Sequence, residues 1–270
     1  MTLSRSYTVV LLCLLSTGGW LACKKTVTVH LDEVPPRIVI EGEIINQPGA
    51  YEVRVTKTVN FSDSNTFPPV SGAEVRITDT TNGIGYDLQE TSPGLYTVNG
   101  SIGIPRHTYQ LYVKAEGQVY TAVSTMPDVV HLDSVTFAIN TDFNGTKELN
   151  AVVNFQDPAG VVNYYQFLEY VNGRLIPNNF VFEDRLSDGR YIEQPLYNDS
   201  SYLHKGDSLL LRMYCVDKNI YNYFFSLMQV SGNNGGFQTA SPNNPLSNIS
   251  GGALGYFSAH TVSRIRMEVY

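Results

Sequence analysis

The segment Arg37–Thr58 reads RIVIEGEIINQPGAYEVRVTKT, and it decides the fold class that we expect for the chain. Apolar and polar residues alternate on both sides of Asn46–Gly49, whose composition is typical of a turn. Alternation places every second side chain on the same face of a β-strand, so one face can be buried while the other is exposed. The segment therefore predicts two antiparallel strands joined by a short loop.

Similar strand-like segments follow this pair at short intervals. Asn82–Gly83 is a strong signal for a hairpin turn, and Glu116–Gly117 predicts a second one. Seven short strands with frequent turns predict an antiparallel, immunoglobulin-like or prealbumin-like β-sandwich over residues 37–127, ending at Met126–Pro127. The strand-like segments after the first pair are residues 71–79, 80–90, 93–98, 107–115 and 118–125.

Residues 128–270 predict a second β-rich domain. We expect a polar, irregular stretch up to about Gly206 and a long loop at residues 231–257, because the latter is rich in Gly, Asn, Ser and Pro. Cys215 lies in a continuous apolar run and is expected to be a buried small hydrophobic residue. The strand-like segments of this part are residues 132–140, 148–157, 161–173, 207–217 and 261–270.

One short helix is expected at residues 219–230. Tyr221, Phe224, Phe225 and Met228 recur at helical spacing and form one stripe, which we expect to face the core. Asp217 precedes them as an N-cap, since its side chain can accept hydrogen bonds from the first free backbone N–H groups.

The N-terminal residues indicate a secretory signal that ends at a cysteine. A positive Arg5 precedes the apolar run Val9–Leu15, which is far shorter than the roughly 20 residues that a membrane-spanning helix needs. Ala22–Cys23 resembles the end of a bacterial lipoprotein signal, although the two residues before Ala22 depart from the usual pattern. We therefore expect a signal peptide at residues 1–22, a lipidated Cys23 and a tether at residues 23–36. An ordinary signal peptide with an incidental cysteine is the alternative.

Composition and motifs argue against several function classes. The formal charge is −7 and no basic block is present, so a nucleic-acid partner is not expected. The sequence has no nucleophile-elbow, P-loop, zinc-protease or paired-cysteine motif, and its five histidines lack metal-ligand spacing. We therefore expect no enzymatic activity, no cofactor and no metal.

Two acidic segments have features of a metal site or of a catalytic site. Residues 140–145 resemble the start of a calcium loop, but Ala151 stands where the bidentate Glu should be, and Asn144–Gly145 suits a hairpin turn better. Glu183, Asp184, Asp188 and Glu193 could supply paired carboxylates for glycoside hydrolysis, but interspersed charges on a loop usually form a solvated surface.

Three segments together resemble a known family. They are PPRIVIEGEIINQPGAYEVRVTKTVNF at residues 35–61, FPPVSGAEVRITD to HTYQLYVKAEGQVYTA at residues 67–122, and GGALGYFSAHTVSR at residues 251–264. The pattern is similar to the domain-of-unknown-function 4249 family of Bacteroidota outer-membrane lipoproteins. The resemblance implies the same sandwich followed by a second β-rich domain, the lipidated Cys23, and a loop near the C-terminus at residues 251–260. It also implies a TonB-dependent receptor nearby, because family members often accompany one.

These features lead us to expect a non-enzymatic lipoprotein that is anchored in the outer membrane. It would be an accessory or ligand-capture subunit of a TonB-dependent nutrient-uptake system; a free-standing surface glycan- or peptide-binding module is the alternative, and a hydrolase is a third candidate. The expected ligand contacts are Phe237, Tyr256 and Phe257 on the long loop, although the last two could instead be buried against the second sheet. Lys24–Lys25 after the cysteine leave the choice between the cell-surface and periplasmic faces open.

Overall fold

The computed structural model describes residues 35–60, 66–141, 144–198, 201–230 and 244–270. Residues Pro36–Tyr270 form one compact unit. The predicted fold class, mainly β with large sheets and one short helix in the described part of the chain, is confirmed. The boundary that we place between residues 127 and 128 stays a prediction. Cys23 and Phe237 lie outside the described residues.

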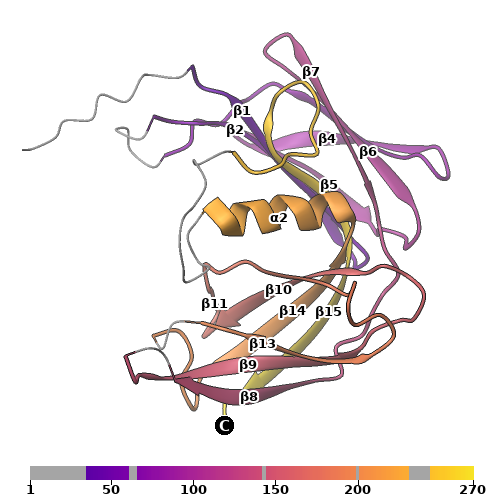
Figure 1. Cartoon of the computed structure of the whole chain (residues 1–270). Helices are drawn as coiled ribbons and strands as arrows, with labels where there is room; N and C mark the ends of the chain where they lie inside the picture. The colour runs from indigo at the N-terminus through magenta and orange to yellow at the C-terminus, as the bar shows by residue number, and fades with distance from the viewer. Residues whose placement is uncertain (1–34, 61–65, 142–143, 199–200, 231–243) are drawn as a thin grey trace, which may run out of the picture. The chain divides into compact units, whose positions relative to one another are not determined.

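Twelve of the described strands belong to one large sheet (Figure 1). Their order is β11-β10-β14-β15-β1-β2-β5-β4-β3-β6-β7, with β12 paired to β10. The bounds are β1 Ile38–Ile45, β2 Gly49–Lys57, β3 Glu74–Asp79, β4 Ile84–Ser92, β5 Leu95–Ser101, β6 Thr108–Ala115, β7 Gln118–Thr125, β10 Tyr164–Val171, β11 Arg174–Leu175, β12 Phe180–Glu183, β14 Ser208–Val216 and β15 Leu254–Glu268.

The seven strands expected in the first part of the chain are all present as β1–β7. Their alternating apolar residues meet in one core, to which Ile40 of β1, Val53 of β2 and Leu111 of β6 contribute. The turns also form where the sequence predicts them, because Gly83 and Gly117 have φ angles of 77° and 79°. Glycine tolerates this left-handed region without steric cost, which explains its place in both hairpins.

The last strand joins the two parts of the sheet. Residues 254–260 of β15 pair in parallel with β1, and residues 261–268 pair antiparallel with β14. The prediction of a long loop at residues 231–257 is therefore wrong from Leu254 onward, and so is the loop that the family resemblance implies at residues 251–260. The glycines there mark a close approach between two backbones, which a single sequence cannot distinguish from a loop.

A second core lies between β10 and β14 of the large sheet and a separate three-stranded sheet. That sheet has the order β13-β9-β8, with β8 Ser134–Thr141, β9 Lys147–Gln156 and β13 Tyr191–Leu196. Phe155, Phe167 and Leu211 are fully buried in this core. The predicted hairpin at Asn144–Gly145 is confirmed by the pairing of β8 with β9. The stretch that we expected to be irregular contains β11, β12 and β13, whose short lengths give little periodic signal.

Helix α2, Lys218–Val230, lies against one face of the large sheet (Figure 1). Asp217 is its N-cap, as predicted, because its Oδ1 accepts hydrogen bonds from the backbone N–H groups of Asn219 (2.8 Å) and Ile220 (3.1 Å). The predicted core stripe is wrong, because the buried face of the helix is rotated by part of a turn from it. The buried residues are Ile220 and Phe224, whereas Phe225 is exposed, because the strands that pack on the helix set its rotation.

None of the helices in the described ranges combines the length and the apolar character that crossing a membrane requires.

Candidate functional site

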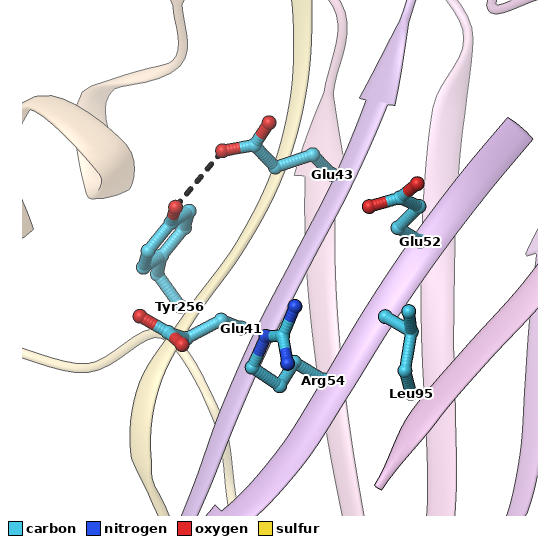
Figure 2. A pocket seen from close by; sticks show the side chains of 6 residues that line it. All are labelled: Glu41, Glu43, Glu52, Arg54, Leu95 and Tyr256. Atoms are coloured by element: carbon cyan, nitrogen blue, oxygen red, sulfur yellow. Dashed lines mark hydrogen bonds between the residues drawn. The ribbon is translucent and has the colours of Figure 1, made fainter. Parts of the chain in front are cut away.

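A hollow of about 200 Å³ lies on the face of the large sheet against which α2 packs. Its lining comes from four neighbouring strands, as Figure 2 shows. The lining residues are Glu41 and Glu43 of β1, Glu52 and Arg54 of β2, Leu95 of β5 and Tyr256 of β15.

Strand register explains why these side chains gather on one face. Glu41 lies directly opposite Arg54 on β2 and opposite Tyr256 on β15, and residues opposite each other point to the same side of a sheet. Because side chains alternate along a strand, Ile40 and Ile44 face the core while Glu41 and Glu43 face the hollow. Each polar group of the site is thus held by a strand that the core fixes in place.

The hollow carries excess negative charge. It holds three carboxylates and one guanidinium, and Arg54 forms no ion pair among the residues that the structure describes. The Tyr256 hydroxyl donates a hydrogen bond to Glu43 Oε1 at 2.9 Å (Figure 2). Shielding from water raises the pKa of Glu41; Arg54 opposes this shift and Glu43 adds to it. The site therefore favours a positively charged ligand, which would neutralise the clustered carboxylates.

Tyr256 is partly buried in the wall of the hollow. Burial raises the pKa of its hydroxyl, and the neighbouring Glu43 carboxylate raises it further. The hydroxyl therefore stays protonated and remains a hydrogen-bond donor over the whole range of ordinary pH. Its ring contacts Tyr223 and Phe224 of α2, with ring centroids 5.0 Å away in both cases, so the helix supports one wall of the hollow.

Comparison with protein families identifies the chain. The model for a domain of unknown function (DUF4249) matches residues 24–266. The chain belongs to the DUF4249 family. The match includes β1–β14 and all of β15 except its last two residues, and it begins one residue after Cys23. No curated protein matches this DUF4249 chain.

The structure separates the two aromatic residues that the sequence predicts as ligand contacts. Tyr256 faces the hollow, but on β15 rather than on a loop. Phe257 points to the opposite face and is fully buried in the first core, where it packs over Gly42. The expectation that Phe257 is exposed is therefore wrong; it is buried, although in the first core and not against the second sheet. Phe237 lies outside the described residues.

Sequence motifs do not predict the acidic residues of the hollow as a site, although the alternating pattern indicates that they share one face. Glu41, Glu43 and Glu52 occupy polar positions of the alternating pattern in Arg37–Thr58. The pattern predicts that they share the exposed face once the hairpin forms. Their proximity to Tyr256 could not be found this way, because Glu43 and Tyr256 are 213 residues apart in the sequence.

The histidine at the end of residues 251–260, His260, has a structural role. His260 is buried, and its ring stacks on Tyr214 with centroids 4.3 Å apart. Burial lowers the pKa of His260, while the charge of Glu43 opposes this shift. Its Nδ1 lies 2.9 Å from Ser258 Oγ. A neutral, fully enclosed imidazole of this kind packs between neighbouring strands and does not reach solvent.

Cys215 is buried as predicted. Burial raises the pKa of its thiol, which keeps the side chain in its unreactive protonated form.

The acidic group Glu183, Asp184, Asp188 and Glu193 is divided by the fold. Glu183 lies 3.7 Å from Arg185, and Glu193 is exposed on β13. Asp184 and Asp188 instead meet Asp157, which sequence spacing does not indicate.

Proposed function

We propose that this DUF4249 protein is an outer-membrane lipoprotein of the Bacteroidota type, anchored through Cys23. It serves as a non-enzymatic accessory or ligand-capture subunit beside a TonB-dependent nutrient transporter. The observation that carries the ligand-capture part is the acidic hollow with Tyr256 at its edge. Membership of the DUF4249 family and the Ala22–Cys23 sequence support the remaining parts.

The chemistry of the hollow suggests which ligands the protein captures. Three carboxylates and a tyrosine hydroxyl on rigid strands suit an ammonium or guanidinium group. Among the ligand classes considered from the sequence, a peptide with basic side chains or a free N-terminus fits better than a neutral glycan.

Because the protein is anchored in the membrane, a weak interface with the transporter is sufficient for the two to associate. Each buried methylene contributes about 0.8 kcal/mol, so the several acyl chains of a lipidated cysteine hold a protein stably at a membrane. Confinement to the same membrane raises the effective concentration of the domain at its transporter. A ligand captured in the hollow can then be released close to the transporter even when neither contact is strong.

We expect a TonB-dependent receptor to co-purify with the tagged protein in a detergent pull-down from native outer membranes. Cys23→Ala removes the acylation site and is the control, and it should lose the receptor because the protein is no longer confined to the membrane. Recovery of the lipidated wild-type protein alone would contradict the transporter part. The function would then be that of a free-standing surface peptide-binding module.

We expect the double variant Glu41→Gln/Glu52→Gln to bind a trilysine peptide at least about tenfold more weakly than the wild type. Two carboxylates near the ligand each contribute about 1 kcal/mol at moderate ionic strength, and this contribution falls as salt is added. Isothermal titration calorimetry at two salt concentrations measures the effect. Glu74→Gln on β3 removes one exposed charge far from the hollow and should leave the affinity unchanged. Equal affinities of the wild type and the double variant would rule out the hollow as the binding site.

A further inference from the structure

Three aspartate carboxylates converge on the side of the second core, away from the acidic hollow. Asp157 follows β9, while Asp184 and Asp188 lie in the loop between β12 and β13. One oxygen of each lies within 4.8 Å of the others. Asp157 and Asp184 are only 1% exposed, and Asp188 is exposed. Among the described residues, no Lys, Arg or His forms an ion pair with any of the three.

Neighbouring groups hold the three carboxylates in position. Asp157 Oδ1 accepts a hydrogen bond from the Tyr165 hydroxyl at 2.5 Å, and its Oδ2 accepts one from the Gly189 N–H at 3.0 Å. Asp188 Oδ1 accepts one from the Gly160 N–H at 2.8 Å. The loop after β9 and the loop between β12 and β13 therefore hold each other in place. The carboxylates are arranged before any ligand binds.

Asn163 supplies a fourth oxygen on the same side. The register that pairs Tyr164 with Glu183 continues to Asn163 and Asp184, whose backbones bond at 3.3 Å (Asp184 N–H to Asn163 C=O). Residues opposite each other in an antiparallel pair point to the same face, so the Asn163 side chain extends beside that of Asp184. The Asn163 N–H also donates to Asp184 Oδ2 at 2.9 Å. Asn163 is 7% exposed, and its side-chain Oδ1 has no hydrogen-bond partner.

This arrangement is unfavourable without a positive charge. Buried carboxylates are costly unless they are paired, and a buried amide oxygen without a donor adds a further cost. Burial raises the pKa of Asp184; the Asn163 N–H opposes the shift, and the charges of Asp157 and Asp188 add to it. A cation that contacts all four oxygens would remove the repulsion and satisfy the Asn163 oxygen at once.

We propose that Asp157, Asp184, Asp188 and Asn163 form a binding site for one divalent cation of the calcium type. All the donors are oxygens, which hard cations prefer, and three carboxylates plus an amide oxygen are a typical calcium set. Calcium–oxygen distances of about 2.3–2.6 Å allow ligands on opposite sides to be roughly 4.6–5.2 Å apart, which accommodates the observed cluster. Magnesium is less suited, because it retains several waters and is bound through one or two carboxylates.

The cation would connect the two layers that enclose the second core. Asp157 extends β9 of the three-stranded sheet, whereas Asn163 and Asp184 extend the β10–β12 pair of the large sheet. Asp188 is exposed and gives the ion an entry from solvent. The site is independent of the acidic hollow and of the transporter proposal, since none of its residues lines the hollow.

The test uses the full-length protein in detergent after treatment with EDTA. We expect isothermal titration calorimetry with CaCl₂ to show one ion per chain. At about 100 times the dissociation constant, calcium should raise Tm by roughly 5 °C. MgCl₂ at the same concentration should bind at least tenfold more weakly. Asp188→Asn should weaken calcium binding at least tenfold, and its exposed position makes misfolding an improbable cause.

Two further variants distinguish loss of the cation site from a general effect of substitution. Asn163→Leu keeps the backbone contacts and the approximate side-chain size but removes the amide oxygen, so it should also weaken calcium binding. Asp133→Asn removes an exposed carboxylate elsewhere and should bind calcium like the wild type. The absence of heat and of a Tm change in the wild type would overturn the proposal, as would equal calcium binding by Asp188→Asn. A Tm that responds to acid but not to calcium would show instead that the buried pair shares a proton.

Discussion

Gly255→Ala is expected to lower the free energy of unfolding by about 4 kcal/mol, which is a large effect for a single methyl group. A Cβ at this position would lie 2.0 Å from the Ile40 carbonyl oxygen and 2.8 Å from its carbonyl carbon. Both atoms are backbone, so β1 and β15 would have to move apart. Overpacking of this kind typically costs about 1–3 kcal/mol, and the φ angle of 93° adds about 1–2 kcal/mol for a residue other than glycine.

The cost should spread beyond the site of the change. β15 pairs with β1 through residues 254–260 and with β14 through the rest of its length. Separating β1 from β15 would disturb the first core, to which Phe257 belongs, and would displace Tyr256 from the acidic hollow. Unfolding by urea, monitored by circular dichroism, measures the change in stability.

Gly252→Ala is the matched control for this prediction. Gly252 also has a positive φ, 82°, but nothing lies within 4 Å of a Cβ placed there. The free energy of unfolding of Gly252→Ala should fall only by the cost of the backbone conformation, about 1 kcal/mol. Equal losses in the two variants would show that the backbone angle, and not the contact with Ile40, limits residue 255.

Glu169→Gln is expected to remove the part of the pH dependence of stability that Glu169 causes between about pH 4.5 and pH 7. Glu169 lies on β10 and is 1% exposed. Its Oε2 accepts a hydrogen bond from Asn198 Nδ2 at 2.6 Å, but its Oε1 has no partner. Burial raises the pKa of Glu169 from 4.5 to about 7, and the Asn198 hydrogen bond only partly opposes this shift.

The direction of the pH effect follows from proton binding. Between pH 4.5 and pH 7 the folded protein keeps a proton on Glu169, whereas the unfolded chain releases it. The free energy of unfolding therefore falls as pH rises through this interval, because the folded state binds more protons. A shift of this size corresponds to about 3 kcal/mol, which is present in full below about pH 4.5 and is lost as pH rises through about 7.

Urea unfolding at several pH values measures this slope for the wild type and for Glu169→Gln. The glutamine cannot titrate, so the stability of the variant should fall less than that of the wild type as pH rises through this interval. Glu193→Gln, which changes an exposed residue on β13, should keep the wild-type slope. A slope unaffected by Glu169→Gln would place the responsible proton on another group.

Local sequence patterns specify most of the secondary structure of the first part of the chain. Alternation in Arg37–Thr58 and the later segments was sufficient to predict β1–β7, because burial on one face imposes a period of two residues. Glycines at the two hairpins and the cap at Asp217 were predictable for a similar reason, since each depends on only a few neighbouring residues. β11–β13 were missed, because strands of two to six residues contain too few positions for a period to be recognised.

Which distant segments meet depends on long-range strand pairing, which no local pattern reveals. Backbone hydrogen bonds hold β15 against β1, and they are available to any strand, so no residue type marks the partner or the register. That register determines that Tyr256 joins Glu43 in the hollow while Phe257, the next residue, is buried in the core. Asp157 likewise meets Asp184 and Asp188 only because two sheets enclose the second core. Sequence patterns thus specify each face of a strand, whereas the long-range pairing of strands specifies the sites.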